Sequence, residues 1–283
     1  MRIKVLTDST ADLAPADIER YDIGVIPLHV HFGSQTYLDK VELTIEDFFE
    51  KQSQTKVNPT TSQPATGRFI EFFQAALSDH DLVVYIAVSD KLSGTYSGAK
   101  LAEAEIDDER LLVLDSGNVT FSLGMIVLAF ARRIDRLKSA DEARRLLEIL
   151  KSEIRSYYII DTMEYLIRGG RLSRLQGTIG GLLGIKPIIT VSDGVLDVAG
   201  KARGFRRAMS EVISLIEQDV PEHELGNIGL FHAMAPERLT EFEVRLRQKF
   251  KVSAVYQSMV GSVVGTHSGP GAIAIAFFRD CKL

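Results

Sequence analysis

The chain has 283 residues, of which 45% are hydrophobic and 25% are charged. This composition is typical of an ordinary globular protein, and the length favours one large domain or two moderate ones. The formal net charge of −5 argues against a nucleic-acid partner, because nucleic-acid binding usually requires a basic surface.

No apolar run approaches the roughly 20 residues that a membrane-spanning helix needs, so no span is predicted. The opening sequence MRIKVLTDST contains no apolar segment typical of a signal peptide. The single cysteine, Cys281, has no internal disulfide partner, which suits a reducing compartment. We therefore expect a cytoplasmic protein.

Strands and helices alternate along the first part of the chain. The predicted strands occupy residues 3–7, 23–28, 29–32, 82–88 and 111–114. Helices are predicted with Pro15 in the first turn, after the capping residues Thr44 and Ser139, and over residues 69–77 and 121–134. Several strands are apolar throughout, which is typical of a parallel sheet covered by helices on both faces. We predict a three-layer α/β/α domain with a mainly parallel sheet at residues 1–157.

The pattern changes after residue 157. Strands are predicted at residues 157–160, 187–191, 195–198, 227–231, 252–258 and 273–278, and helices at 205–219 and 236–250. The turn Ser192-Asp193-Gly194 lies between two short strands and indicates a hairpin. We predict a second, α+β domain with a mixed sheet at residues 158–283.

Three loops are rich in hydroxyl groups and glycine: PTTSQP at residues 59–64, SGTYSG at 93–98 and the Gly-rich segment 261–271. The first two lead into predicted helices, where free N–H groups and the helix dipole favour a bound anion. Capping alone explains any one such loop, but three together favour a binding site. Further polar residues follow the predicted strands, where α/β sheets bind ligands: Asp8-Ser9-Thr10, Ser93-Gly94 and Asp115-Ser116.

Hydroxyl groups with one histidine suit a carboxylate ligand. Ser and Thr donate O–H groups, and a protonated His267 would add a charge-assisted hydrogen bond. The three loops contain no Arg or Lys, which argues against a fully phosphorylated ligand.

Motifs for catalysis and cofactors are weak or missing. Ser93 with His267 as its base would suit a serine hydrolase, but no G-x-S-x-G surrounds Ser93. HExxH and CxxC are absent, and His29 and His31 are more typical of surface histidines than of zinc ligands. Neither GxxxxGK[ST] nor GxGxxG occurs, so ATP binding is not expected. We predict no metal and no cofactor.

Five motifs in order along the whole chain closely resemble the DegV family: TDSTADL, PTTSQPA, SGTYSGA, DTMEYLIRGGRLS and GSVVGTHSGPGA. This family includes the fatty-acid-binding subunits of bacterial fatty acid kinase. The resemblance implies a non-catalytic carrier that holds a long-chain fatty acid, such as palmitate, stearate or oleate, in an apolar tunnel between the two domains. A separate ATP-binding kinase subunit would convert the carboxylate to an acyl phosphate for phospholipid synthesis.

The resemblance also implies site residues. The fatty-acid carboxylate is expected at Thr61, Ser93 and His267, with Ser62 and Gly94 beside them. The apolar residues of the sequence themselves suggest where the lipid tail would lie, although each also suits a place in the protein core: Leu28, Val30, Phe32, Ile70, Phe73, Ile167, Leu182, Leu183, Ile185 and Ile188. The kinase subunit is expected to dock on Arg168, Arg171, Arg174, Lys201 and Arg203.

Two other interpretations stay open. The first is a hydrolase or acyltransferase that uses Ser93 as nucleophile and His267 as base. The second rests on the distant similarity of this fold to dihydroxyacetone kinase, and it would bond His267 covalently to a small carbonyl substrate.

Overall fold

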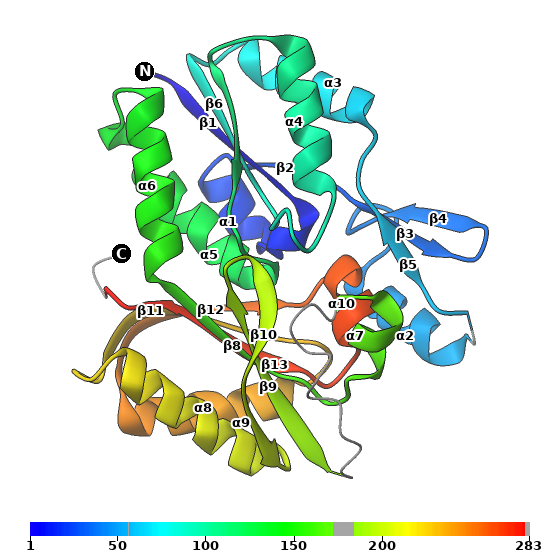
Figure 1. The fold of residues 1–283 in the computed structure, drawn as a ribbon, viewed down its shortest axis with the longest axis vertical. Coiled ribbons are helices and arrows are strands. Elements are labelled where there is room, and N and C mark those ends of the chain that lie inside the picture. Colours follow the sequence, from blue (N-terminus) through cyan, green and yellow to red (C-terminus); the bar gives the residue numbers. More distant parts are fainter. Residues whose placement is uncertain (56, 172–183, 281–283) are drawn as a thin grey trace.

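The computed structural model describes residues 1–55, 57–171 and 184–280. The N-terminal half is built on a parallel sheet with the strand order β2-β1-β6-β7 (Figure 1). Its strands are β1 (Ile3–Asp8), β2 (Gly24–Ile26), β6 (Leu82–Ala87) and β7 (Leu111–Asp115). After β1 the chain adds β2 on one side of β1. It later adds β6 on the other side of β1, so the direction in which strands are added reverses at β1.

Helices cover both faces of this sheet, as predicted. On one face, Phe69 and Phe73 pack with Val83 and Tyr85 of β6 in one core cluster. On the other face, the neighbouring β6 residues Val84 and Ile86 belong to a second cluster. The helices are α1 (Pro15–Arg20), α3 (Thr66–Leu77), α4 (Thr95–Ile106), α5 (Thr120–Ala131) and α6 (Ala140–Glu153), with short 3-10 turns at Ser9–Ala11 and Ile134–Arg136.

A small antiparallel sheet with the order β4-β3-β5 lies beside the N-terminal sheet. It contains β3 (His29–Phe32), β4 (Gln35–Leu38) and β5 (Thr60–Ser62), and helix α2 (Ile45–Gln54) connects β4 to β5. Both predicted caps are present, because Thr44 accepts from the Asp47 N–H and Ser139 from the Glu142 N–H. Strand β5 was expected to be loop. This segment forms a strand because it pairs with the edge of β3, where Val30 lies opposite Thr61.

The C-terminal half is a six-stranded mixed sheet with the order β10-β9-β8-β13-β11-β12, in which β11 and β12 run parallel. Its strands are β8 (Ile154–Ile159), β9 (Ile185–Ser192), β10 (Val195–Arg203), β11 (Glu224–His232), β12 (Lys251–Met259) and β13 (Ile273–Phe278). Helices α8 (Phe205–Asp219) and α9 (Pro236–Lys249) pack on the same side of the sheet as Ile228 and Ile275. The predicted hairpin is β9–β10, and the domain boundary predicted after residue 157 lies within β8.

Two further short helices lie within the described residues: α7 (Glu164–Gly169) and α10 (Ser262–Ser268). The α10 segment was expected to be loop, because valine, threonine and glycine are weak helix formers. Packing overrides this preference. A Cβ placed on Gly265 would lie 2.8 Å from the Phe49 ring and 3.0 Å from the Phe48 ring, so α10 lies directly against α2.

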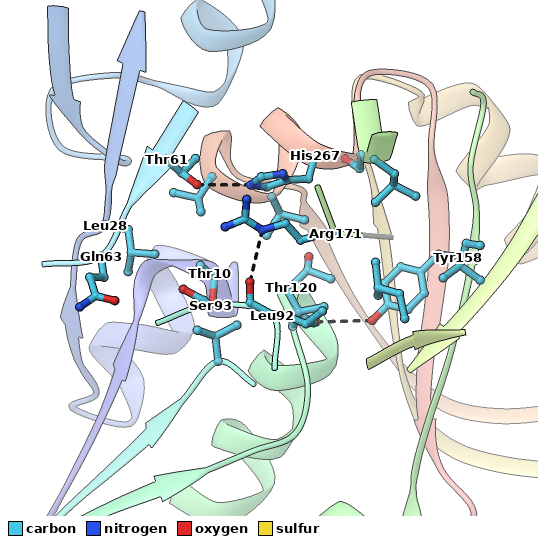
Figure 2. Close-up of a pocket in the computed structure, with 18 of the residues that line it drawn as sticks. Thr10, Leu28, Thr61, Gln63, Leu92, Ser93, Thr120, Tyr158, Arg171 and His267 are labelled. Carbon is cyan, nitrogen blue, oxygen red and sulfur yellow. Dashed lines mark hydrogen bonds between the residues drawn. The ribbon is translucent and has the colours of Figure 1, made fainter. Parts of the chain in front are cut away.

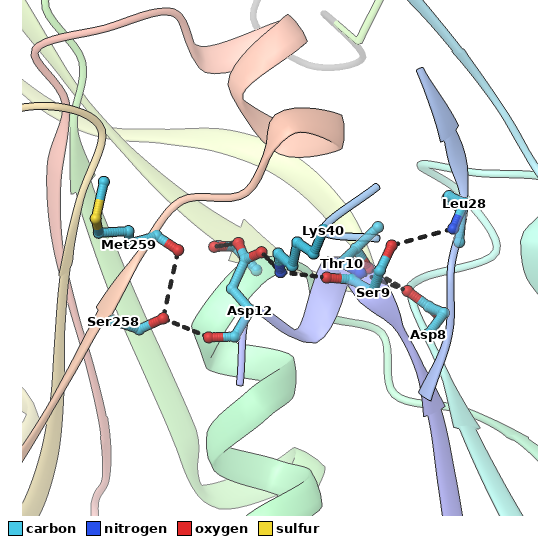
Figure 3. Close-up of polar contacts among 9 residues, drawn as sticks. Asp8, Ser9, Thr10, Asp12, Leu28, Lys40, Ser258 and Met259 are labelled. Carbon is cyan, nitrogen blue, oxygen red and sulfur yellow. Dashed lines mark hydrogen bonds and ion pairs between the residues drawn. The ribbon is translucent and has the colours of Figure 1, made fainter. Parts of the chain in front are cut away.

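A buried ion pair of the N-terminal half, Asp12–Lys40, lies where the His-bearing end of the C-terminal half packs against it (Figure 3). Asp12 is 2% exposed; its Oδ1 accepts from Lys40 Nζ at 2.5 Å and its Oδ2 from Thr120 Oγ1 at 2.7 Å. Ser258, at the end of β12, donates to the Asp12 carbonyl oxygen. A Cβ on Gly261, just before α10, would lie only 2.5 Å from Asp12 Oδ1.

The same cluster holds strained backbone. Asp12, Lys40 and Thr120 have φ values of 50°, 61° and 53°, in the left-handed region that non-glycine residues rarely adopt. Such conformations persist where the surrounding contacts hold them. Although burial favours its neutral amine, the Asp12 and Asp39 carboxylates hold the pKa of Lys40 above its ordinary value. The Asp12–Lys40 pair is therefore a charged contact within the joint between the two halves.

Candidate functional site

A cavity of about 310 Å³ lies between the two halves of the molecule. Thr10, which follows β1, and Ser93, which follows β6, lie on its wall (Figure 2). These are the carboxyl ends of the two strands where the strand order reverses, the usual ligand position in such sheets. Asp115, the last residue of β7, and Ser116, which follows it, line a separate groove.

The polar end of the cavity brings together the three residues expected to bind a carboxylate: Thr61 from β5, Ser93 before α4 and His267 from α10 (Figure 2). Thr61 Oγ1 and His267 Nε2 are joined by a hydrogen bond of 3.3 Å, and Ser93 Oγ lies 2.8 Å from Thr95 Oγ1. The three side chains come from segments more than thirty residues apart, so only the fold makes them neighbours.

The two expected neighbours, Ser62 and Gly94, also line the cavity. Ser62 Oγ bonds to His31 Nε2 at 2.8 Å, which fixes its side chain across the small sheet. Gly94 lies at the N-cap of α4, and a Cβ there would meet Gln63 Oε1 at 2.2 Å. Glycine at this position lets the loop lie directly beside the Gln63 side chain at the cavity wall.

His267 is held neutral rather than protonated, contrary to the expectation of a charged imidazole. Burial, together with the charge of Arg171, lowers its pKa to about 4. Its Nδ1 atom is buried without a hydrogen-bond partner among the described residues, and Gly169 packs against the ring. At neutral pH the imidazole can therefore offer a hydrogen bond to a carboxylate but no positive charge.

The positive charge at the site comes from Arg171, which sequence reasoning assigned to kinase docking. Its half-buried guanidinium lines the cavity and donates to the Leu92 carbonyl at 3.4 Å (Figure 2). It also donates to the Gly169 carbonyl at 2.6 Å. Burial lowers its pKa from the ordinary value, yet an arginine stays charged. The three loops contain no basic residue, but the site as a whole contains a cation, because Arg171 reaches it from another segment.

The depressed pKa of His267 makes a prediction about stability. With a pKa of about 4 folded and 6.5 as the ordinary value, the unfolded chain binds this proton more tightly, so stability is lost as pH falls between these values. We expect the free energy of unfolding of wild type, measured relative to a His267→Gln variant, to fall by up to about 3 kcal/mol across this window. Urea unfolding at a series of pH values measures it.

The His267→Gln variant also controls for the other groups that titrate in this range. Burial raises the pKa values of Asp8 and Asp39, which gives a pH dependence of the opposite sign. Both proteins carry these carboxyl groups, so their effect cancels in the difference. Parallel curves for the two proteins would show that His267 titrates normally in the folded state.

Away from its polar end the cavity is lined by aliphatic and aromatic side chains: Leu28, Val88, Leu92, Val119, Tyr158, Ile160, Leu166, Ile189, Leu196, Val263 and Val264. Of the residues expected to contact a lipid tail, Leu28 is among them. Val30, Phe32, Phe73 and Ile188 are buried in the hydrophobic cores, Ile70 packs against one of them, and Ile167 is 44% exposed. Ile185 begins β9, and Leu182 and Leu183 lie outside the described residues.

The difference at β9 has a simple cause. Successive side chains of a strand point to opposite faces, so Ile189 faces the cavity while Ile188 faces α8 and α9. The sequence shows that both residues are apolar but not which face meets the other domain.

The remaining residues expected at a docking face are exposed where the structure describes them. Arg168 forms an ion pair with Glu164 and donates to Asn58 Oδ1 at 2.9 Å, while Lys201 and Arg203 are exposed on β10. Arg174 lies outside the described residues.

The geometry does not assemble a serine hydrolase. In the described part of the chain, Ser93 bonds to Thr95 and His267 to Thr61, and no hydrogen bond joins Ser93 to His267. No group of three metal-ligating side chains is found among residues 1–55, 57–171 and 184–280. Across the same residues, none of the helices is both long and apolar enough to traverse a bilayer.

The fold and the cavity define a class of protein: an α/β and an α+β domain that enclose a pocket with one polar end and apolar walls. A family model described as "Uncharacterised protein, DegV family" matches residues 2–280. The chain belongs to the DegV family.

Relatives of known structure share the whole architecture. The protein DegV of Bacillus subtilis is 32% identical over 278 residues, covering 98% of this chain and 99% of that protein. Its crystal structure, described as that of a fatty acid binding protein, has a TM-score of 0.89 to this fold, with 98% and 99% coverage. A DegV family protein from Thermus thermophilus, described by its fatty acid binding, has a TM-score of 0.92 at 29% identity, covering 98% and 99% of the two chains.

Proposed function

We propose that this protein binds a long-chain fatty acid in the cavity between its domains and presents the carboxylate to a separate ATP-dependent kinase. The observation that carries the proposal is the division of one cavity into a polar end at Thr61, Ser93 and His267 and apolar walls elsewhere. The fatty acid binding of the Thermus thermophilus and Bacillus subtilis relatives supports it.

The polar end meets the electrostatic requirement of such a ligand. A buried carboxylate is costly unless hydrogen bonds and a counter-charge compensate it. Ser93 and Thr61 supply hydroxyl donors, and Arg171 supplies the positive charge that neutral His267 does not. The apolar walls would bury the tail, which contributes about 0.8 kcal/mol per methylene and therefore most of the affinity.

The proposed role is that of a carrier in the cytoplasm, without catalytic residues, metal or cofactor of its own. The kinase subunit would reach the carboxylate from the open polar end, where Gly94 is exposed. The exposed Arg168, Lys201 and Arg203 are the residues we propose for its docking. The acyl phosphate formed there would enter phospholipid synthesis.

Native mass spectrometry followed by organic extraction tests the binding step directly. We expect one fatty acid per chain in the purified protein, or rebinding of oleate after delipidation. A chain that carries no lipid and takes up neither oleate nor palmitate would refute the proposal and leave the fold assignment intact.

If the protein presents the carboxylate to the kinase, a change at Ser93 should affect the rate of acyl-phosphate formation more than the affinity for the fatty acid. Replacing Ser93 by alanine should slow acyl-phosphate formation by the kinase subunit about a hundredfold, since Ser93 is positioned to stabilise charge at the reacting carboxylate. Oleate affinity should fall only about tenfold, because tail burial supplies most of the binding energy. Ser97→Ala, an exposed serine of the same loop and helix, is the matched control. Equal losses in both assays would contradict this division.

A further inference from the structure

Tyr158 closes the side of the cavity that lies across from Thr61 and Leu28 (Figure 2). It is on β8 and only 8% exposed. Apart from the imidazole of His267, Tyr158 carries the only ring among the described residues that line the cavity. The largest side chain of the apolar wall thus lies across the cavity from Thr61 (Figure 2).

The Tyr158 ring is fixed from two directions. Its hydroxyl group lies 2.8 Å from Ser122 Oγ and donates to the Val119 carbonyl at 3.4 Å, both near the start of α5. Its ring packs in a T-shaped arrangement with the Phe231 ring, with centroids 5.7 Å apart and an interplanar angle of 74°. Turning the ring out of the cavity would break these contacts, so Tyr158 forms a rigid wall.

We propose that Tyr158 determines which length of fatty-acid tail the cavity accepts, an inference that rests on the proposed function. With the carboxylate at Thr61 and Ser93, the tail runs towards the opposite wall. Methylenes that stop short of the ring are buried, whereas further ones meet a side chain that cannot move aside. Each methylene gained in a buried site improves affinity about fourfold, so the position of this wall decides where the gain ends.

Two substitutions separate the ring from its hydroxyl group. Tyr158→Val removes the ring and lengthens the cavity, whereas Tyr158→Phe keeps the ring and removes only the hydroxyl. In the Phe variant Ser122 keeps a partner, because its hydroxyl also donates to the Val119 carbonyl at 2.6 Å. The Phe variant is therefore a matched control for the loss of the hydrogen bond.

The measurement is the affinity of delipidated protein for saturated fatty acids from laurate to arachidate. We expect the Val variant to move the best tail to a longer acid, raising the ratio of long-tail to short-tail affinity about fourfold per added methylene. The Phe variant should keep the wild-type ratio. Thermal unfolding shows which variants are folded, and Tyr158→Leu replaces the Val variant if that one is not.

An unchanged ratio in a folded Val or Leu variant would overturn the inference. So would an equal shift in the Phe variant, since the hydroxyl group and not the ring would then be responsible. If the wild-type protein binds none of the acids, the proposed function fails and this inference falls with it. A wild type that binds fatty acids while the Val variant keeps its preference refutes the role of Tyr158 alone.

Discussion

Replacing Lys40 by methionine is expected to lower the free energy of unfolding by about 3 kcal/mol, because the Asp12 carboxylate would stay buried without its cation. Asp12 keeps only the Thr120 hydroxyl as a side-chain partner in that variant. The estimate is at the lower end of values for broken buried pairs, since the Lys40 side chain is 25% exposed and water can partly replace it. Urea or thermal unfolding measures the loss.

Two variants serve as controls for that experiment. Lys4→Met breaks an ion pair whose partner, Asp22, is 81% exposed, and it should cost no more than about 1 kcal/mol. Adding Asp12→Asn to Lys40→Met removes both charges and should recover part of the loss. If Lys40→Met costs no more than Lys4→Met, the buried Asp12–Lys40 pair contributes no more to stability than an exposed ion pair does.

Replacing Gly169 by alanine is expected to reduce fatty-acid affinity about tenfold or more while the fold stays intact. The new Cβ would lie 2.0 Å from His267 Nδ1 and 2.9 Å from Cε1, so the imidazole must leave the position in which it bonds to Thr61. Hydrogen bonds to a charged group are worth about 1.5–3 kcal/mol, which corresponds to at least a tenfold change in affinity. Calorimetric titration with oleate at neutral pH measures it.

The adjacent glycine provides the control. A Cβ on Gly170 meets no atom within 4 Å, and its φ of 69° is one that asparagine tolerates better than other side chains. Gly170→Asn should therefore lose some stability and keep its affinity for oleate. Wild-type affinity in a folded Gly169→Ala protein would mean that the position of His267 does not govern ligand binding.

The sequence predicted the elements and the class of fold because local patterns decide them. The uniformly apolar β6 indicated a parallel sheet, and helix α8 and strand β13 have the predicted bounds. Helix α10 was missed because its valine, threonine and glycine residues favour other structures until α2 packs against them. Strand β5 was missed for the same kind of reason, since it exists only through its pairing with β3.

The site was predicted unevenly, and long-range packing explains the difference. Thr61, Ser93 and His267 lie in motifs that the sequence displays, and the structure brings them to one cavity. Arg171 was placed on the surface because nothing in the sequence around it shows that its guanidinium turns back into the cavity. Tyr158 was not predicted as a site residue. The alternation along β8 assigns its side chain to one face of the sheet, but only the packing of the two domains shows that this face lines the cavity.

Helix α5 has a consequence for how the protein is made. All twelve of its residues are buried, and they contact not only α6 but also the C-terminal strands, as in the Phe121–Phe231 ring pair with centroids 6.0 Å apart. Those strands lie later in the chain, and a ribosome adds about 5–20 residues per second. A nascent chain thus carries an apolar helix that is covered on only part of its surface for several seconds after α5 emerges. We therefore expect the N-terminal half on its own to expose an apolar surface that favours chaperone binding or aggregation, and a prematurely terminated product to be degraded by proteases.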